Sequence, residues 1–425
     1  QLIGVGAPDY DRIEFAGTIA GTQLQHTFQG GTYDVYSDVV LRDPTAWQHI
    51  VISFDSTQIP GSRVSFYYNG DLVPDQGTGN GEVPADFESE LLGNSITTDL
   101  CGGGGGAGNI NSYLSEYIAI DGKSIQNGDV AISAFGTENS DGVWVPVDPT
   151  TVFSSGSDFG NNGFYLDFAD SSALGNDVSG NNNDFTTTAT TSANFTYDRP
   201  ADSGTDIGNY ATLNALNIGA YAIGYGTLSR GNLVHLGTSA LNGQAATTTI
   251  SNSSGKWYWE VTYTTVAGAY PIVGILKTGT EATTSSTNEA VINNVTDGWF
   301  CNFSASRINT GWGAISAGTV MMFALDQDNG AFYVGRNGTW ETVSSVVGIP
   351  DSGASKTGAI STLATLSTPL TPLVIDYNGS KTTSNFGASN GFAYPIGAAN
   401  DTEGFAPLAT QSLPAPTVTN PSNHF

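Results

Sequence analysis

The chain has 425 residues, of which only 12% are charged. Twelve Lys and Arg against 39 Asp and Glu give a net charge of −27, which argues against nucleic-acid binding and against acidic membrane surfaces, because phosphate contacts need clustered basic residues. No window has the length and apolarity of a transmembrane helix. None shows helical periodicity with charged faces either, so we expect helix in less than roughly 10% of residues.

The composition points to a β protein with a polar, uncharged surface. Charged residues have about half their usual frequency, so Ser, Thr, Asn and Gly must cover most of the surface. We predict an all-β fold of two tandem antiparallel jelly-roll β-sandwiches with a short linker and an extended proline-rich tail. The first residues do not resemble a secretory signal, and residue 1 is Gln, so we expect a processed or partial product.

The sharpest pattern of the first half is a predicted β-hairpin. In HIVISFD, the apolar side chains of Ile50, Ile52 and Phe54 alternate with polar ones and share one face. A second alternating run, RVSFYY, ends at Asn69-Gly70, which is the strongest short-range hairpin signal. We therefore expect two paired strands whose apolar face lies in the core of the first domain.

Residues 74–112 look like a long irregular loop that ends in a run of glycines. Within it, Asp86, Glu88 and Glu90 are spaced so that their carboxylates would share one face of a strand, as the acid and the nucleophile of jelly-roll glycosidases require. The flanking Pro84 favours an irregular loop instead, so a structural interpretation outweighs a catalytic one.

Several stretches of the first half carry a family resemblance. AWQHIVISFDSTQIPGSRVSFYYNGDLV resembles the central hairpins of LamG-like, concanavalin-type jelly rolls, whose opening strands would precede Gln1. SEYIAIDGKSI, GVWVPVDP and NGFYLDFADSSALGNDVSGNNNDFTTT then follow in the order found in LamG-domain virion proteins of tailed bacteriophages. The resemblance covers residues 30–215 and places the first domain at residues 1–187. It implies a structural protein of a virion.

The run DSSALGNDVSGNNND within this domain is rich in side-chain oxygens. Calcium prefers several carboxylate, amide and carbonyl oxygens on a glycine-containing loop, and LamG-like domains sometimes hold calcium in this way. The same residue types are also good turn formers, and the spacing is not that of an EF-hand. Two interpretations stay open: a set of turns, or a calcium site formed by Asp170, Asp177, Asn181 and Asp184. We expect no other cofactor.

The second domain, at residues 216–396, is organised around the strand KWYWEVTY. Its side chains Trp257, Trp259, Val261 and Tyr263 point to one face, because side chains alternate along a strand. Two indoles on one face bury a large apolar area, which predicts packing against a second sheet. GKWYWEV followed by IVGIL resembles the signature of SPRY domains, which are interaction modules with a β-sandwich fold.

The two domains repeat one order of elements. HIVISFD, a turn and RVSFYYNG in the first correspond to VMMFALD, a turn and AFYVGRNG in the second, which supports two related sandwiches. The Thr-, Ala- and Asn-rich residues 188–215 are predicted to link them. The prolines of residues 397–425 predict an extended tail that gains order by docking against a domain or a neighbouring subunit.

The candidate ligand contacts are aromatic residues on loops, Trp312 and Tyr270. Trp312 lies in NTGWG, where the flanking glycines could hold the indole open for stacking on a sugar; burial is the alternative. The loops at residues 102–111, 170–184 and 278–294 are expected to supply further contacts. The two cysteines and four histidines form no metal or catalytic motif, so we predict no catalytic residue.

Together these patterns favour a non-enzymatic protein of the virion surface, a tail fibre or appendage that attaches to host-surface glycans. We expect a homo-oligomer, most simply a trimer, that contacts other virion proteins and neither binds nucleic acid nor inserts into a membrane. Two alternatives stay open: a capsid-decorating or filament-forming protein without a ligand, and a polysaccharide-degrading enzyme on a jelly-roll fold.

Overall fold

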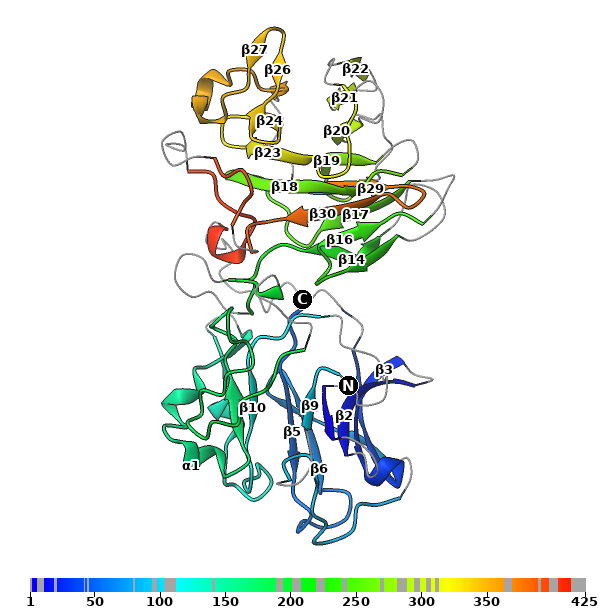
Figure 1. The fold of residues 1–425 in the computed structure, drawn as a ribbon, viewed down its shortest axis with the longest axis vertical. Coiled ribbons are helices and arrows are strands. Elements are labelled where there is room, and N and C mark those ends of the chain that lie inside the picture. The colour runs from blue at the N-terminus through cyan, green and yellow to red at the C-terminus, as the bar shows by residue number, and fades with distance from the viewer. Residues whose placement is uncertain are drawn as a thin grey trace. The chain divides into compact units, whose positions relative to one another are not determined.

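A computed structural model of the chain describes residues 2–5, 11–18, 21–41, 43, 46–78, 81–93, 98–102, 112–139, 142–188, 194–200, 208–218, 226–238, 243–267, 271–280, 289–293, 299–302, 307–309, 313–362, 369–388, 391–396 and 404–413. The chain divides into two compact units, residues 1–195 and 196–417, drawn from blue to green and from green to red in Figure 1. The strand ladders are antiparallel, and α1 (Gly156–Phe159) is the sole α-helix of the described residues. The prediction of mostly antiparallel β structure with few helices is confirmed.

The first unit is built from short strands. They are β1 (Ile3–Val5), β2 (Arg12–Thr18), β3 (Gly21–Phe28), β4 (Tyr33–Val40), β5 (Ile50–Phe54), β6 (Val64–Tyr68), β7 (Asp71–Val73), β8 (Asp75–Thr78), β9 (Thr98–Leu100), β10 (Tyr117–Ala119), β11 (Gly136–Glu138), β12 (Trp144–Pro146) and β13 (Phe164–Leu166). Its 3-10 helices are η1 (Gln29–Gly31), η2 (Ile132–Ala134) and η3 (Pro149–Thr151). One sheet has the order β8-β4-β3-β2-β1-β9, and a second has the order β5-β6-β7.

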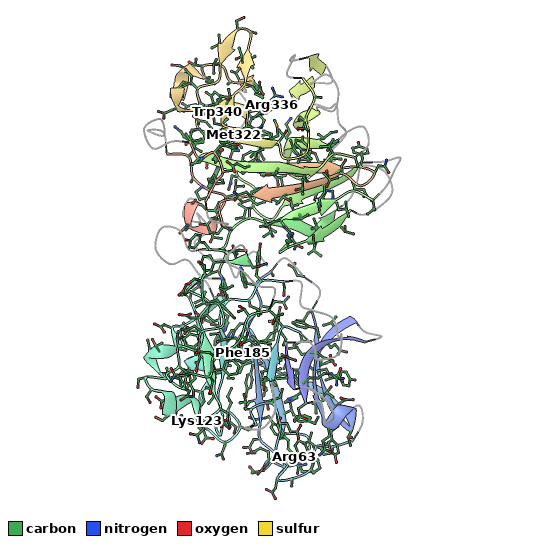
Figure 2. The ribbon with its side chains drawn as sticks, viewed as in Figure 1. Arg63, Lys123, Phe185, Met322, Arg336 and Trp340 are labelled. Atoms are coloured by element: carbon green, nitrogen blue, oxygen red, sulfur yellow. The ribbon has the colours of Figure 1, made fainter. Side chains whose placement is uncertain are left out.

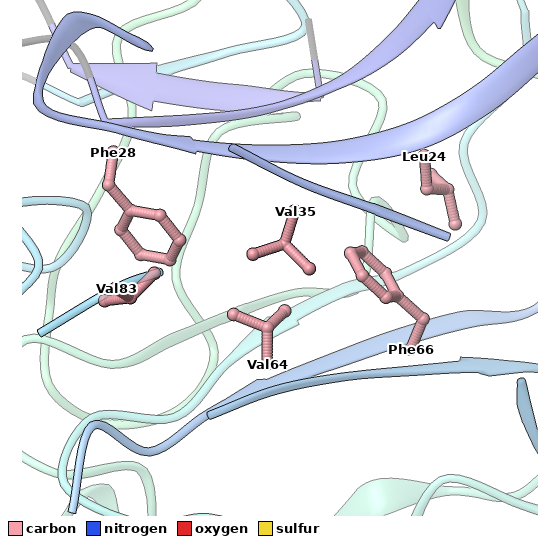
Figure 3. Packing of buried hydrophobic residues seen from close by; sticks show 6 residues of the cluster. All are labelled: Leu24, Phe28, Val35, Val64, Phe66 and Val83. Atoms are coloured by element: carbon pink, nitrogen blue, oxygen red, sulfur yellow. The ribbon is translucent and has the colours of Figure 1, made fainter. Parts of the chain in front are cut away.

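The main core of the first unit lies between these two sheets. Figure 3 shows its buried side chains, which are Leu24 and Phe28 of β3, Val35 of β4, Val64 and Phe66 of β6, and Val83. Ile50, Ile52 and Phe54 pack against this cluster, so the face predicted from HIVISFD is confirmed. Asn69 and Gly70 have φ of 49° and 86°, and the predicted tight turn indeed joins β6 to β7.

Residues 117–187 of the first unit, here called the polar module, contain little sheet. β10 pairs with β13 and β11 with β12, and a small core forms around buried Phe153, Phe159 and Tyr165. Figure 2 labels two of its residues, Lys123 and Phe185. The Lys123 ammonium donates to the carbonyl of Asp158 at 2.8 Å, and the Phe185 N–H donates to the carbonyl of Gly175 at 2.8 Å. Individual hydrogen bonds thus stabilise this module, in the way that β-ladders stabilise the sheets of the protein.

The second unit contains longer strands in two large sheets. They are β14 (Leu213–Ile218), β15 (Thr227–Ser229), β16 (Val234–Leu236), β17 (Gln244–Thr248), β18 (Lys256–Thr265), β19 (Ile272–Lys277), β20 (Glu289–Asn293), β21 (Trp299–Asn302), β22 (Arg307–Asn309), β23 (Val320–Asp326), β24 (Ala331–Arg336), β25 (Thr339–Trp340), β26 (Thr342–Val343), β27 (Val346–Val347), β28 (Ser361–Thr362), β29 (Leu370–Asp376) and β30 (Lys381–Asn385). Its 3-10 helices are η5 (Pro350–Ser355) and η6 (Thr410–Ser412). The sheet orders are β14-β17-β29-β19-β20-β21-β22 and β15-β16-β30-β18-β23-β24-β25, with β28 paired to β24; β26 and β27 pair separately.

β18 is central to the second of these sheets, and both of its faces are buried. Trp257, Trp259, Val261 and Tyr263 are at most 2% exposed, and Trp259 stacks on Phe323 with ring centroids 5.3 Å apart. The burial predicted for this face is therefore confirmed. Tyr258 and Glu260 on the opposite face are only 2% exposed as well, because another segment of the chain covers them.

That covering segment, here called the strap, consists of residues 391–396 and 404–413. The Glu260 carboxylate accepts the N–H groups of Ala393 at 2.8 Å and Tyr394 at 2.6 Å. The Ala406 N–H donates to the carbonyl of Lys256 at 3.0 Å, at a point of β18 that lies beyond the last residue paired with β30. Phe392 and Tyr394 pack on the buried cluster of Tyr258 and Met322, and Figure 2 labels Met322. Residues 391–396 thus cover the outer face of this sheet, and Ala406 extends the sheet beside β18.

The structure corrects the sequence-based interpretation in three places. The predicted irregular loop of residues 74–112 contains β8 and β9, and the predicted loop of residues 278–294 contains β20. The predicted linker of residues 188–215 includes buried Tyr210 and the first residues of β14. These strands lack a clear apolar alternation, and pairing with other strands determines them. β8, β9 and β14 pair with strands distant in sequence, whereas β20 pairs with its neighbours β19 and β21. Of the predicted tail, residues 404–413 belong to the strap and residues 414–425 lie outside the described residues.

Among the residues described, no helix has both the length and the apolar character needed to cross a membrane.

Candidate functional site

The oxygen-rich run predicted as either turns or a calcium site lies in the polar module. The Asn181 amide donates to the carbonyls of Gly160 at 2.6 Å and Gly163 at 2.9 Å, which lie just after α1 and just before β13. Asn183 donates to the carbonyl of Gly163 at 2.9 Å. These amides tie the run to the loop between α1 and β13.

Asp177 is the hub of this arrangement and is 7% exposed. Its Oδ1 accepts the N–H groups of Tyr165 and Ser179, each at 2.9 Å. Its Oδ2 accepts the Ser179 hydroxyl at 2.9 Å and the N–H of Asn183 at 2.8 Å. Burial acts to raise the pKa of Asp177, but these hydrogen bonds outweigh it, and the pKa lies below its ordinary value.

The other two predicted calcium ligands also bond to the protein. Asp184 Oδ1 accepts the N–H of Asp177 at 2.9 Å, so the structure brings these two residues together. Asn181 is linked to Asp177 through Ser179, whose hydroxyl donates to Asp177 and accepts the N–H of Asn181 at 3.2 Å. Asp170 forms a separate turn, in which Oδ1 accepts the hydroxyl of Ser172 at 2.6 Å and its N–H at 2.8 Å. These two bonds, the hydroxyl first, lower the pKa of Asp170.

These contacts favour the turn interpretation over the calcium interpretation. Both carboxylate oxygens of Asp177 and one each of Asp170 and Asp184 already accept N–H or O–H groups, and an ion bound to these oxygens would have to displace those donors. In the described part of the chain, no group of three or more His, Cys, Asp and Glu side chains could hold a metal ion.

The predicted acidic trio does not form a catalytic pair. Asp86 lies in a turn with φ of 56°, and Asp86 and Glu88 are exposed outside any strand. Between them, Phe87 packs against the core of the first unit. The Glu90 N–H is held by Asp11 at 2.8 Å. The segment thus anchors an irregular loop, and its carboxylates do not share one strand face.

Both aromatic ligand candidates, Trp312 and Tyr270, lie outside the described residues. So does most of the predicted contact loop at residues 102–111. The loop at residues 278–294 is described only at residues 278–280 and 289–293. The proposed ligand contacts therefore stay predictions from the sequence.

His49 takes part in a structural contact. The Trp144 indole N–H donates to His49 Nδ1 at 3.0 Å, and burial lowers the pKa of His49. The Trp144 ring lies against Gly70 and Gly136, where a side chain would collide with it. Because Gly70 is in the β6–β7 turn and Gly136 begins β11, the indole joins the hairpin to the polar module.

His26 is a buried histidine that the sequence pattern did not single out. It is 2% exposed, its ring stacks on Phe28 with centroids 3.9 Å apart, and neither ring nitrogen has a hydrogen-bond partner among the described residues. Burial lowers the pKa of His26 to about 3, so the ring is neutral near neutral pH.

A second buried polar group lies in the second unit and was also missed. His235 Nδ1 lies 2.9 Å from Asp376 Oδ2, and both side chains are fully buried. The Thr382 hydroxyl donates to the same Asp376 oxygen at 2.7 Å. His235 and Asp376 are 141 residues apart, so no local spacing could have indicated their contact.

No protein-family model and no curated protein matches the chain. Solved structures do. The chain is similar to the SPRY domain of human HERC1, with 12% identity over 36% of this chain and 87% of that one, at a TM-score of 0.27. It is also similar to the PSpry domain of TRIM65, with 14% identity over 41% of this chain and 92% of that one, at a TM-score of 0.29. This likeness concerns the fold alone, a SPRY-like β-sandwich region of the chain.

Proposed function

We propose that this chain is a structural protein on the virion surface of a tailed bacteriophage, in a tail fibre or appendage that attaches to host-surface glycans. The observation that carries the proposal concerns the stretches of the polar module that resemble virion proteins of tailed bacteriophages. The polar side chains of these stretches form hydrogen bonds within the module. They brace the main chain: Asp177 accepts three N–H groups, and Asn181 holds two carbonyls. Polar side chains that are bonded to the main chain in this way suit a rigid scaffold better than an active site.

The remaining parts of the proposal come from the sequence. They are a LamG-like jelly roll for the first unit, self-association as a trimer, contacts with other virion proteins, and glycan stacking on Trp312 and Tyr270. A low charge and a surface rich in Ser, Thr and Asn suit sugar recognition through hydrogen bonds. The exposed positions of Asp86 and Glu88 lend no support to the enzyme alternative.

Antibody labelling of intact particles, imaged by electron microscopy, tests the location. Label on tail fibres or appendages is expected. Label on the capsid would favour the decoration alternative, and absence of the chain from purified particles would refute a virion role.

Sedimentation of the purified chain at micromolar concentration should show a trimer; a monomer would contradict self-association.

The ligand assignment has its own test in host-cell adsorption. Trp312→Ala should lower adsorption and leave the melting temperature unchanged, whereas Trp257→Ala should lower the melting temperature because Trp257 is buried. The assignment is wrong if Trp312→Ala melts early, or if it adsorbs like the unchanged chain.

A further inference from the structure

We infer that the core of the second unit contains a binding site for an ordered water molecule, between Tyr263 of β18 and Asp376 of β29, with Ser384 of β30 beside it. The site is independent of the proposed virion role. It is carried by polar atoms that three strands place in the core and that have no hydrogen-bond partner among the described residues.

The first of these atoms belongs to Asp376, whose side chain is fully buried. Both of its hydrogen bonds, from His235 and from Thr382, reach Oδ2. Oδ1 is buried and has no hydrogen-bond partner among the described residues. A buried carboxylate oxygen without a donor costs considerable free energy, so a donor is expected there.

The second atom is the hydroxyl of Tyr263. This side chain is fully buried and lies opposite Thr382 in the β18–β30 ladder, on the side where Thr382 reaches Asp376. Burial, and then the nearby charge of Asp376, raise the pKa of Tyr263 well above its ordinary value. The hydroxyl therefore lies in the field of Asp376, yet within the described structure it bonds to no protein group.

The Tyr263 hydroxyl and Asp376 Oδ1 are complementary as hydrogen-bond donor and acceptor, but they are not bonded to each other. A phenol hydroxyl donates and accepts, and a carboxylate oxygen only accepts, so the two would bond directly if the distance allowed. A polar pair separated by more than a hydrogen bond is commonly bridged by water, which can accept from Tyr263 and donate to Asp376. The Ser384 hydroxyl is also buried without a partner in the described chain. Ser384 lies two residues from Thr382, on the same face of β30, and is the third contact that we infer. Buried waters usually make about three hydrogen bonds.

A metal ion fits this site less well than water. Cations with oxygen ligands need several carboxylate or carbonyl oxygens, and here Asp376 Oδ1 is the one carboxylate oxygen of the site without a hydrogen-bond partner in the described chain. The described chain also has no cluster of three His, Cys, Asp or Glu side chains that could hold a metal ion. A bridging water would link β29 of one sheet to β18 and β30 of the other, and thus fix how the sheets pack.

The test uses the full chain with Tyr263→Phe, which removes one hydroxyl and keeps the ring. If water bridges the pair, the folding equilibrium constant should fall roughly three- to tenfold, and oxygen-17 water relaxation dispersion should lose a long-lived water. If the Tyr263 hydroxyl is not bonded to water, the variant should be more stable than the unchanged chain, because the substitution removes a buried polar group without a partner.

Tyr333→Phe is the matched control, because the Tyr333 hydroxyl bonds directly to Ser352 Oγ at 3.1 Å. It should lose comparable stability and keep the water signal. A Tyr263→Phe chain with unchanged water relaxation, or with raised stability, would overturn the inference. Should that variant not fold, a crystal structure of the unchanged chain decides: electron density within hydrogen-bond distance of Tyr263 Oη and Asp376 Oδ1 supports the site, and a dry gap refutes it.

Discussion

The polar module of the first unit and the sandwich of the second unit are stabilised in different ways. In the second unit β18 is ten residues long, pairs with strands on both sides, and buries large side chains on both faces. In the polar module the strands β10 and β13 have three residues each. There, side chains such as those of Asp177 and Asn181 form hydrogen bonds with main-chain groups that are not paired in a β-ladder.

The two units should therefore be sensitive to different kinds of substitution. A sandwich that buries indoles depends mainly on apolar area and packing, so loss of volume is the most damaging change. A loop-rich module depends on satisfying its buried main-chain groups, so the loss of a single acceptor is the most damaging change. Substitutions in the two units separate these two modes of stabilisation.

The largest effect is expected for Trp257→Ala in β18. Trp257 is 2% exposed, and removing a buried aromatic side chain should cost about 3–5 kcal/mol of unfolding free energy. Chemical denaturation, followed separately for the two units, should show an early transition of the second unit and an unchanged first unit. Val347→Ala is the control, because Val347 is 52% exposed and should change stability by at most about 0.5 kcal/mol.

Asp177→Ala should have the next largest effect, and it should fall on the first unit. It removes the acceptor of three N–H groups and one hydroxyl, and leaving such buried donors unpaired should cost about 2–3 kcal/mol. Hydrogen exchange of the Tyr165, Ser179 and Asn183 amides should accelerate. Asp170→Ala, in its exposed turn, should leave these amides protected; equal effects of both variants would contradict the role of Asp177 as a hub.

His26 should make the first unit sensitive to acid. The pKa of His26 is lowered to about 3 in the folded chain, while an unfolded histidine titrates near pH 6.5. Below pH 6.5 the unfolded chain binds the proton and the folded chain does not, so this stability is complete above pH 6.5 and falls as the pH drops toward 3. The loss should be about 2 kcal/mol at pH 5.

His26→Leu should remove this part of the acid sensitivity, measured as the change in unfolding free energy between pH 7 and pH 5. His26→Phe serves as a second apolar replacement that differs in shape. Other groups, such as Asp177, add their own acid dependence, so the comparison with the unchanged chain carries the result. The same loss in all three chains would show that His26 is not the cause.

The smallest effect is expected from calcium. The carboxylates of Asp170, Asp177 and Asp184 accept hydrogen bonds from the protein, so the loop should close without an ion. The melting temperature of the first unit should be the same in calcium and in chelator. If calcium raises the melting temperature, and Asp184→Asn abolishes this increase, the calcium interpretation would be restored.

Parts of this fold could be predicted from residue order. Alternation marked β5, β6 and β18, because strands place the side chains of one face at every second position. β23 and β24 were marked by the repeated order of elements, since they are buried on both faces and do not alternate. Asn-Gly pairs marked two turns, at Asn69 and at Asn337, because both positions of each turn take positive φ. The candidate site was predicted only in part: a hydrogen bond joins Asp177 to Asp184, and Ser179 links Asn181 to Asp177, whereas Asp170 forms a separate turn.

The order of neighbouring residues was enough to predict the β class and the apolar faces of the strands with clear alternation. Which of the opposite faces are also covered depends on segments that lie far away in the sequence. Nothing near Glu260 indicates that the strap, more than 130 residues later, buries it and supplies its hydrogen bonds. The same holds for His235 and Asp376, which contact each other because separate strands converge in one core. Long-range pairing of this kind depends on packing, and packing leaves no local pattern in a sequence.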